Sequence, residues 1–182
     1  MYLKIAPELA YRVMTGGPVI NISTKSASGV SDVMTAAWNC PFDGGEMLAV
    51  LDRGHTTSAN ILATGKYVIS IPSLEQKELV LKAGSKHGRD CGDKFEALGL
   101  PSEVSREWGL KVIAGSMAYI ECELCDRDLF AATGILRGKV KNVYVQEEMW
   151  NKAAENFDPG CRHTLHHVSS AIFVSGGTVC GA

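Results

Sequence analysis

The sequence lacks the features of a membrane-spanning or nucleic-acid-binding chain. No run approaches the roughly 18 consecutive apolar residues that a transmembrane helix needs, and Met1–Leu9 carries Lys4 and Glu8 where a signal peptide would be apolar. The 18 Lys and Arg residues nearly balance the 20 Asp and Glu residues, and they form no concentrated basic stripe. We therefore expect a cytoplasmic protein that binds neither membrane nor nucleic acid.

Several common catalytic motifs are missing as well. The sequence contains no GxGxxG after a strand, no GxxxxGK[ST], no HExxH and no GxSxG. These absences argue against the common nucleotide-binding folds, zinc proteases and serine hydrolases. The chain also has no internal repeat and no long flexible linker, so its 182 residues predict a single domain over residues 1–182.

The six cysteines are scattered, and free thiols are expected. Cys122 and Cys125 have the spacing of a CxxC metal or redox motif. However, residues 117–125 alternate between apolar and polar as a half-buried strand does, and positions i and i+3 of a strand point to opposite faces. We therefore expect Cys122 in the core and Cys125 facing outward, without zinc or thioredoxin-like chemistry.

Three histidines, His163, His166 and His167, cluster near the C-terminus. No set of carboxylates or cysteines near them has convincing metal-ligand spacing, and no metal site is expected. The cluster is either a solvated loop or the lining of a pocket beside a bound substrate or cofactor.

Short β-branched runs predict a mainly β fold with a few helices. Their order shows no regular strand–helix alternation, so an antiparallel barrel is favoured over a parallel sheet. A loop is expected at Asn39–Glu46, which contains proline and two glycines, and a bulge near Lys141–Asn142. The predicted strands are Val19–Ser23, Val30–Trp38, Met47–Leu51, Tyr67–Ile71, Met117–Cys125, Ile135–Gln146 and, closing the sheet, Ala171–Val174.

Two short helices are expected between these strands. One lies within His55–Thr64, with Thr56 or Thr57 as its N-cap and Gly65 at its C-terminus. The second follows Ser73, which has capping-box spacing to Gln76, and ends at Gly84.

Two segments have the composition of a binding site. The first segment is a strand end in which small residues follow branched ones and a large aromatic comes last: Met34, Thr35, Ala36, Ala37 and Trp38. Small residues let a planar ligand approach the backbone, and an indole ring can form a wall of its slot. A packed strand end with a core tryptophan is the alternative.

The second segment combines a cation with hydroxyl groups at a helix start. It contains Arg53, Thr56, Thr57, Ser58 and Asn60, and a helix N-terminus offers unpaired N–H groups that suit a phosphate. A capped helix with a surface arginine is the alternative. Further along, Lys94 adds a second cation after Gly92.

Taken in order, these segments resemble the flavin reductase-like family of FMN-binding split barrels, which includes flavoredoxin. The resemblance is carried by Pro18–Val19, Met34–Trp38, Arg53–Ile61, the strand Tyr67–Ile71, and Gly88–Asp90 with Asp93–Phe95. It extends more loosely over residues 117–174, including Thr164–His167. Where this family usually has an asparagine, the present chain has Asp32, and an ionised acid cannot donate a hydrogen bond as an amide does.

The resemblance implies an antiparallel Greek-key split barrel, a homodimer and one FMN per subunit. It assigns Arg53, Thr56, Thr57 and Ser58 to the phosphate and Lys94 to the phosphate or the pyrimidine side. The backbone of Met34–Ala37 and the side chain of Trp38 are assigned to the ring, Asn60 belongs to the matching segment, and His166 and His167 are candidates for the pocket lining.

Two functions are consistent with this resemblance. In the first, NAD(P)H delivers a hydride to the flavin, which carries the chemistry without a dedicated acid–base pair. In the second, the protein is a flavoredoxin-type electron carrier that keeps its FMN and exchanges electrons with a redox protein partner. Sequence alone does not separate the flavin reductase from the carrier.

Overall fold

The structure is a computed structural model that describes residues 17–158, 164–169 and 171–176. Met1–Leu9, His163 and two of the cysteines, Cys161 and Cys180, lie outside the described residues. The described parts of the chain contain no helix long and apolar enough to cross a membrane.

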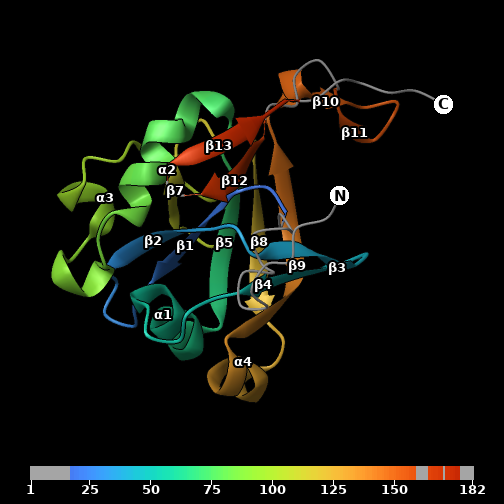
Figure 1. The fold of residues 1–182 in the computed structure, drawn as a ribbon. Helices are drawn as coiled ribbons and strands as arrows, with labels where there is room; N and C mark the ends of the chain where they lie inside the picture. Colours follow the sequence, from blue (N-terminus) through green and yellow to red (C-terminus); the bar gives the residue numbers. More distant parts are fainter. Residues whose placement is uncertain (1–16, 159–163, 170, 177–182) are drawn as a thin grey trace, which may run out of the picture.

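A seven-stranded antiparallel sheet forms the centre of the fold and curls into a half-barrel (Figure 1). Its strands lie in the order β2-β1-β5-β8-β9-β4-β3. The mainly β prediction is therefore confirmed. The strands are β1 (Ile20–Lys25), β2 (Ser31–Ala36), β3 (Asn39–Asp43), β4 (Glu46–Val50), β5 (Lys66–Ile71), β8 (Ala118–Leu124) and β9 (Ile135–Val145).

Short helices and three two-stranded sheets connect and cover this sheet. In Figure 1, α2 and α3 lie beyond the β2 side of the sheet and α4 lies at one end. The helical elements are α1 (Thr56–Thr64), η2 (Leu74–Gln76), α2 (Lys77–Gly84), η3 (Gly88–Asp90), α3 (Lys94–Ala97), α4 (Arg127–Thr133) and η4 (Glu147–Met149). The small sheets pair β6 (Ser102–Val104) with β7 (Lys111–Ile113), β10 (Trp150–Asn151) with β11 (Asn156–Phe157), and β12 (Leu165–Ser169) with β13 (Ile172–Ser175).

One large buried cluster forms where alternate residues of neighbouring strands meet on one face of the sheet. Ile22, Tyr67, Ile120 and Leu136 come from four different strands and belong to one buried cluster. Cys122 is fully buried in the same cluster, and Cys125 is exposed. The predicted divergence of the two thiols is confirmed.

Three local predictions are confirmed by the backbone. The register of β9 against β8 shifts next to Lys141, which is the expected bulge. Gly65 ends α1 in the left-handed conformation at φ 72°, which a residue with a side chain rarely adopts. Ser73 and Gln76 form the predicted capping box, although the turn that they open is η2, which runs directly into α2.

Two strand predictions are wrong. Residues 39–46, expected to be a loop, contain β3, which pairs with β4. Proline is tolerated there because β3 is an edge strand, and the register shifts just after Pro41. The segment expected to close the sheet at Ala171–Val174 instead overlaps β13, which pairs with β12 in a separate hairpin.

Candidate functional site

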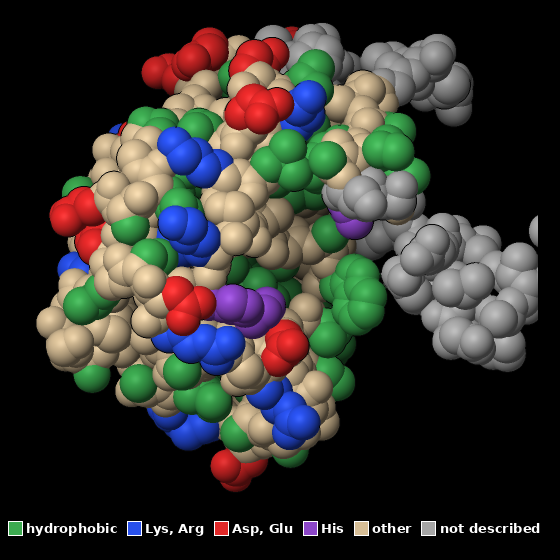
Figure 2. Space-filling model, turned by 60° about the vertical axis from the view of Figure 1, so that its left-hand side comes forward, with side chains coloured by type: hydrophobic (Ala, Val, Ile, Leu, Met, Phe, Trp, Pro, Cys, Tyr) green, Lys and Arg blue, Asp and Glu red, His purple; other side chains and the backbone are tan. Residues whose placement is uncertain are grey.

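A cavity of about 110 Å³ lies between the β2 strand, the start of α1 and the segment that joins α2 to α3. Figure 2 shows histidines beside basic and acidic side chains at a hollow on this face. The cavity is large enough for part of a ligand or a few waters. Its lining residues are Asp32, Met34, Thr35, His55, Thr56, Thr57, Ala83, Gly84, Ser85, Lys86, His87, Gly88 and Lys94.

The start of α1 opens into this cavity. Asp52 sets the turn before the helix, because its side chain accepts a hydrogen bond from the N–H of Gly54 at 2.7 Å and its carbonyl accepts from the N–H of His55 at 3.2 Å. His55 is the N-cap residue, with an extended ψ of 147°, and its side chain does not cap the helix. The first N–H groups of the helix therefore have no side-chain cap, which suits an anion.

The prediction that Thr56 or Thr57 caps this helix is wrong. Both threonines lie inside the first turn, and their hydroxyls bind other elements. Thr56 Oγ1 accepts a hydrogen bond from the N–H of Arg89 at 2.9 Å, which ties η3 to α1. Thr57 Oγ1 donates to Asp32 Oδ2 at 2.5 Å. The two hydroxyls thus join α1 to the loop and to β2 on two sides of the cavity.

Asp32 brings a buried carboxylate to the cavity, with 2% of its surface exposed. One carboxylate oxygen accepts the bond from Thr57, whereas Oδ1 is buried without a hydrogen-bond partner. A Cβ at Gly88 would lie only 2.3 Å from Asp32 Oδ1, so the backbone of η3 can approach the carboxylate only because residue 88 is glycine.

Lys94 brings a buried cation to the same cavity, with 3% of its surface exposed. Burial lowers the pKa of its ammonium group, and the charge of Asp32 opposes that effect. No ion pair joins the two side chains, both of which belong to the described residues. The cavity thus presents two buried charges of opposite sign that do not contact each other.

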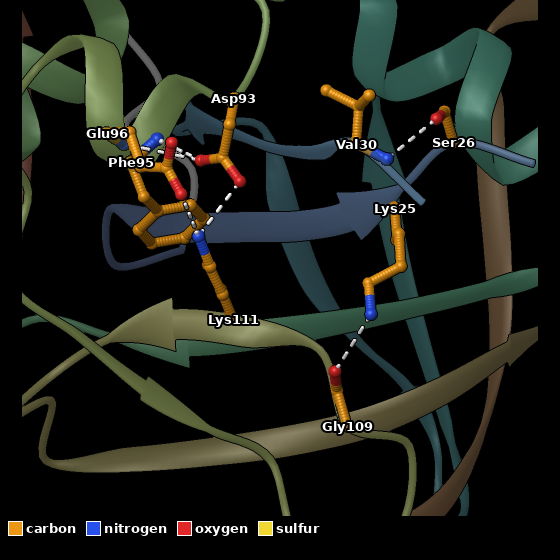
Figure 3. Close-up of polar contacts among 8 residues, drawn as sticks. All are labelled: Lys25, Ser26, Val30, Asp93, Phe95, Glu96, Gly109 and Lys111. Carbon is orange, nitrogen blue, oxygen red and sulfur yellow. Dashed lines mark hydrogen bonds and ion pairs between the residues drawn. The ribbon is translucent and has the colours of Figure 1, made fainter. Parts of the chain in front are cut away.

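Lys94 is placed by the start of α3. The Asp93 side chain caps this helix by accepting from the N–H groups of Phe95 at 3.0 Å and Glu96 at 3.3 Å. Lys111 Nζ bridges Asp93 Oδ2 at 2.9 Å and Glu96 Oε1 at 3.2 Å (Figure 3). This network fixes the first turn of α3 and with it the backbone of Lys94.

Two histidines from different elements meet at the cavity. The ring centroids of His55, before α1, and His87, before η3, lie 5.3 Å apart at an angle of 51°. His55 Nδ1 is buried without a hydrogen-bond partner. Neither histidine was identified from the sequence, because no local motif marks His87 and only the tertiary fold brings η3 against α1.

The predicted ring-binding segment is divided by the structure. Met34 and Thr35 line the cavity, whereas Ala36 is buried in the core at the end of β2. Ala37 packs against a small buried cluster that includes Leu165 of β12. Trp38 has 56% of its surface exposed. The segment therefore runs from the cavity to the outer surface.

Three of the predicted cofactor-binding residues, two of them assigned to the phosphate, do not line the cavity. Arg53 is exposed and donates to the carbonyl of Ala132 in α4 at 3.0 Å. Ser58 is buried and donates to a carbonyl of the turn before α1 at 2.7 Å. Asn60 is buried and donates to Thr24 Oγ1 at 3.0 Å. In the described structure these side chains hold α1 to its neighbours.

The predicted C-terminal histidines also lie outside this cavity. His166 is half-buried on β12, and its Nε2 atom is 3.3 Å from Thr164 Oγ1. His167 is exposed, with its ring centroid 5.6 Å from that of Phe173. Their strand is joined to the start of β1 by a hydrogen bond from the Val19 N–H to the Leu165 carbonyl.

Sequence comparison identifies a family. Residues 12–163 match the sequence model described as the flavin reductase like domain. The uncharacterized protein YddH of Escherichia coli K12 is 28% identical over 181 residues, which is 97% of this chain and 95% of that protein. An uncharacterized protein of Pyrococcus abyssi is 31% identical over 148 residues, covering 80% of this chain and 82% of that protein.

Comparison with solved structures confirms the split-barrel fold. An FMN-binding domain of a flavin reductases-like enzyme from Shewanella baltica superimposes with a TM-score of 0.82 at 24% identity, covering 98% of this chain and 95% of that chain. Flavoredoxin of Desulfovibrio vulgaris superimposes with a TM-score of 0.81 at 19% identity, covering 99% and 97%. At these identities the similarity establishes the fold.

Proposed function

This chain belongs to the flavin reductase-like domain family, and we propose that it is an FMN-binding oxidoreductase that takes electrons from NAD(P)H. The observation that carries the proposal is the cavity in which an uncapped helix N-terminus, two threonines and a buried lysine converge. Solved relatives of the same fold are described as FMN-binding proteins, from Shewanella baltica and from Thermus thermophilus.

The residues at the start of α1 fit the phosphate of FMN. The first N–H groups of the helix carry the positive end of its dipole, and the Thr56 hydroxyl, which accepts from Arg89, still has its own proton to donate. His55, His87 and Lys86 add donors at the same cavity. Arg53 and Ser58, expected at the phosphate from the sequence, are bound to other carbonyls in the described structure.

The segment after Met34 fits the flavin ring. Ala36 and Ala37 have small side chains, which suit the close approach of a flat ligand to the end of β2, and the exposed indole of Trp38 offers an apolar surface at the end of the segment. The cavity at the start of α1 is smaller than FMN, so the ring would lie beyond it, along this segment.

When bound, FMN would supply the capacity to accept a hydride and to pass electrons on. The residues of this chain would then bind and orient the cofactor: the start of α1 would hold the phosphate, and the Met34–Trp38 segment would hold the ring where a nicotinamide can reach it. Such chemistry requires contact between the two rings and no separate acid–base pair.

We further propose that the working unit is a homodimer. Trp38 directly precedes the edge strand β3 and Phe42 lies within it, and 56% and 55% of their surfaces are exposed. Large exposed aromatic side chains are typical of interaction surfaces. A second subunit placed here would cover the open side of the ring site.

Absorption spectroscopy tests the proposed activity. Protein saturated with FMN under anaerobic conditions is mixed with NADH and, separately, with NADPH, and the flavin absorbance is followed. Bleaching within seconds by either nucleotide is expected. Bound flavin that is inert to both nucleotides but is reduced by a redox protein would instead establish an electron carrier, and failure to bind FMN would refute the proposal.

A further inference from the structure

The cavity contains an unmet acceptor and an unpaired cation that the proposed phosphate site does not use. Asp32 Oδ1 is buried with no hydrogen-bond partner, and Lys94 forms no ion pair among the described residues. Burial of a carboxylate is unfavourable unless its oxygens accept hydrogen bonds. A polar group bound between Asp32 and Lys94 could satisfy both side chains.

The chemistry of Asp32 limits what that group can be. A phosphate dianion has no proton to donate and would be repelled by the carboxylate, so the phosphate belongs at the start of α1. A neutral hydroxyl can donate to Asp32 Oδ1 and accept from Lys94 at the same time. The cavity of about 110 Å³ has room for a short hydroxylated chain but not for a three-ring system.

The position of Asp32 along β2 agrees with this requirement. Asp32 and Met34 are two residues apart and therefore point to the same side of the strand, and both line the cavity. Asp32 lies at the α1 end, whereas Met34 leads to the proposed ring segment. A ligand with its phosphate at α1 and its ring beyond Met34 would pass Asp32 with the chain that joins them.

We infer that Asp32 is a specificity-determining residue that accepts a hydrogen bond from a hydroxyl group on the chain between the phosphate and the ring of the bound flavin. Thr57 is a positioning residue, because its hydroxyl holds Asp32 Oδ2 and so fixes the carboxylate that lines the cavity. This inference rests on the proposed function, and it concerns which part of the ligand the protein recognises.

Two uncharged flavins separate the contribution of the Asp32 hydrogen bond from the contributions of phosphate and ring binding. Riboflavin carries the hydroxylated chain and lumiflavin lacks it, so flavin-free protein is titrated with each, following flavin fluorescence. Asp32→Ala is expected to weaken riboflavin binding by about 10- to 100-fold, the range for a hydrogen bond to a charged group. Lumiflavin affinity should change by less than about 2-fold, because that ligand lacks the hydroxyl groups.

Further variants keep the test independent of folding. Asp32→Asn keeps the shape and one oxygen, and it should show a smaller loss for riboflavin only. Thr57→Val should also lower the riboflavin affinity, and Thr57→Ser, which keeps the hydroxyl, should restore it. Asp128→Asn, on the exposed first turn of α4, is the matched control and should leave both affinities unchanged.

The outcomes distinguish this inference from the proposed function. Equal losses for riboflavin and lumiflavin in the Asp32 variants, or no loss for either, would overturn the assignment of Asp32 while flavin binding stood. A native protein that binds neither these flavins nor FMN would refute the proposed function and the inference with it.

Discussion

Replacing Gly88 with alanine should lower both the free energy of unfolding and the affinity for riboflavin. The new Cβ would lie 2.3 Å from Asp32 Oδ1, 2.9 Å from Asp32 Cγ and 3.1 Å from Thr56 Cγ2. Ordinary contact would require η3 or the carboxylate to move by about 1 Å, and overpacking of this kind costs about 1 to 3 kcal/mol. Asp32 cannot move freely, because Thr57 holds its other oxygen at 2.5 Å.

This loss of unfolding free energy predicts the outcomes of two measurements. For a domain of this size, about 1 kcal/mol lowers the melting temperature by about 2 to 4 °C, so the Gly88→Ala protein should melt about 2 to 12 °C lower. Riboflavin affinity should fall by about 10-fold or more, because Oδ1 loses its position in the cavity. Calorimetry and fluorescence titration provide the two values.

The matched control is Gly44→Ala in the β3–β4 hairpin. A Cβ there meets nothing within 4 Å, and the position has no positive φ. Its melting temperature and flavin affinity should equal those of the native protein. If Gly88→Ala behaved like this control in both measurements, the close packing of η3 against Asp32 would be refuted.

Three further predictions concern the core, the thiols and the dimer. A Cβ at Gly138 would lie 1.6 Å from the buried Tyr67 hydroxyl. Gly138→Ala should therefore lower the urea midpoint of unfolding sharply, and adding Tyr67→Phe should recover part of the loss. Equal midpoints for the native protein and Gly138→Ala would contradict this packing. Burial raises the pKa of Cys122 to about 12, so iodoacetamide at pH 8 should modify Cys40 and Cys125 and spare Cys122 in peptide mass spectra. Because the unfolded thiol ionises near 9.0, Cys122 should also make the free energy of unfolding fall from about pH 9 to pH 12, a fall that Cys122→Ala should reduce. By mass action, FMN should lower the concentration at which the dimer dissociates in sedimentation experiments, and identical profiles with and without FMN would show a site built within one chain.

Much of the sheet was predictable because its signals are local. Alternation along β8 placed Cys122 in the core, and the bulge at Lys141 interrupts the pattern of β9 at the expected point. Pro41 misled the prediction, since proline suggests a loop but is also compatible with an edge strand. Whether a strand lies at an edge depends on its neighbours, which a local pattern does not reveal.

The site was predictable only in part, for the same reason. Met34, Thr35, Thr56, Thr57 and Lys94, which the resemblance assigned to one cofactor, line one cavity. The polar side chains of Arg53, Ser58 and Asn60, by contrast, satisfy neighbouring backbone and side-chain groups.

The residues that the sequence did not reveal come from η3 and the turn before α1. His87 and Gly88 approach His55 and Asp32 only because the segment between α2 and α3 folds back over α1. Such long-range convergence has no signature in local spacing.

A crystal structure of the protein grown with FMN tests the central claim most directly. The account predicts the phosphate at the start of α1 beside Thr56, the hydroxylated chain passing Asp32, and the ring along Met34–Trp38. Flavin bound elsewhere, with no atom in the cavity between β2, α1 and η3, would contradict the account.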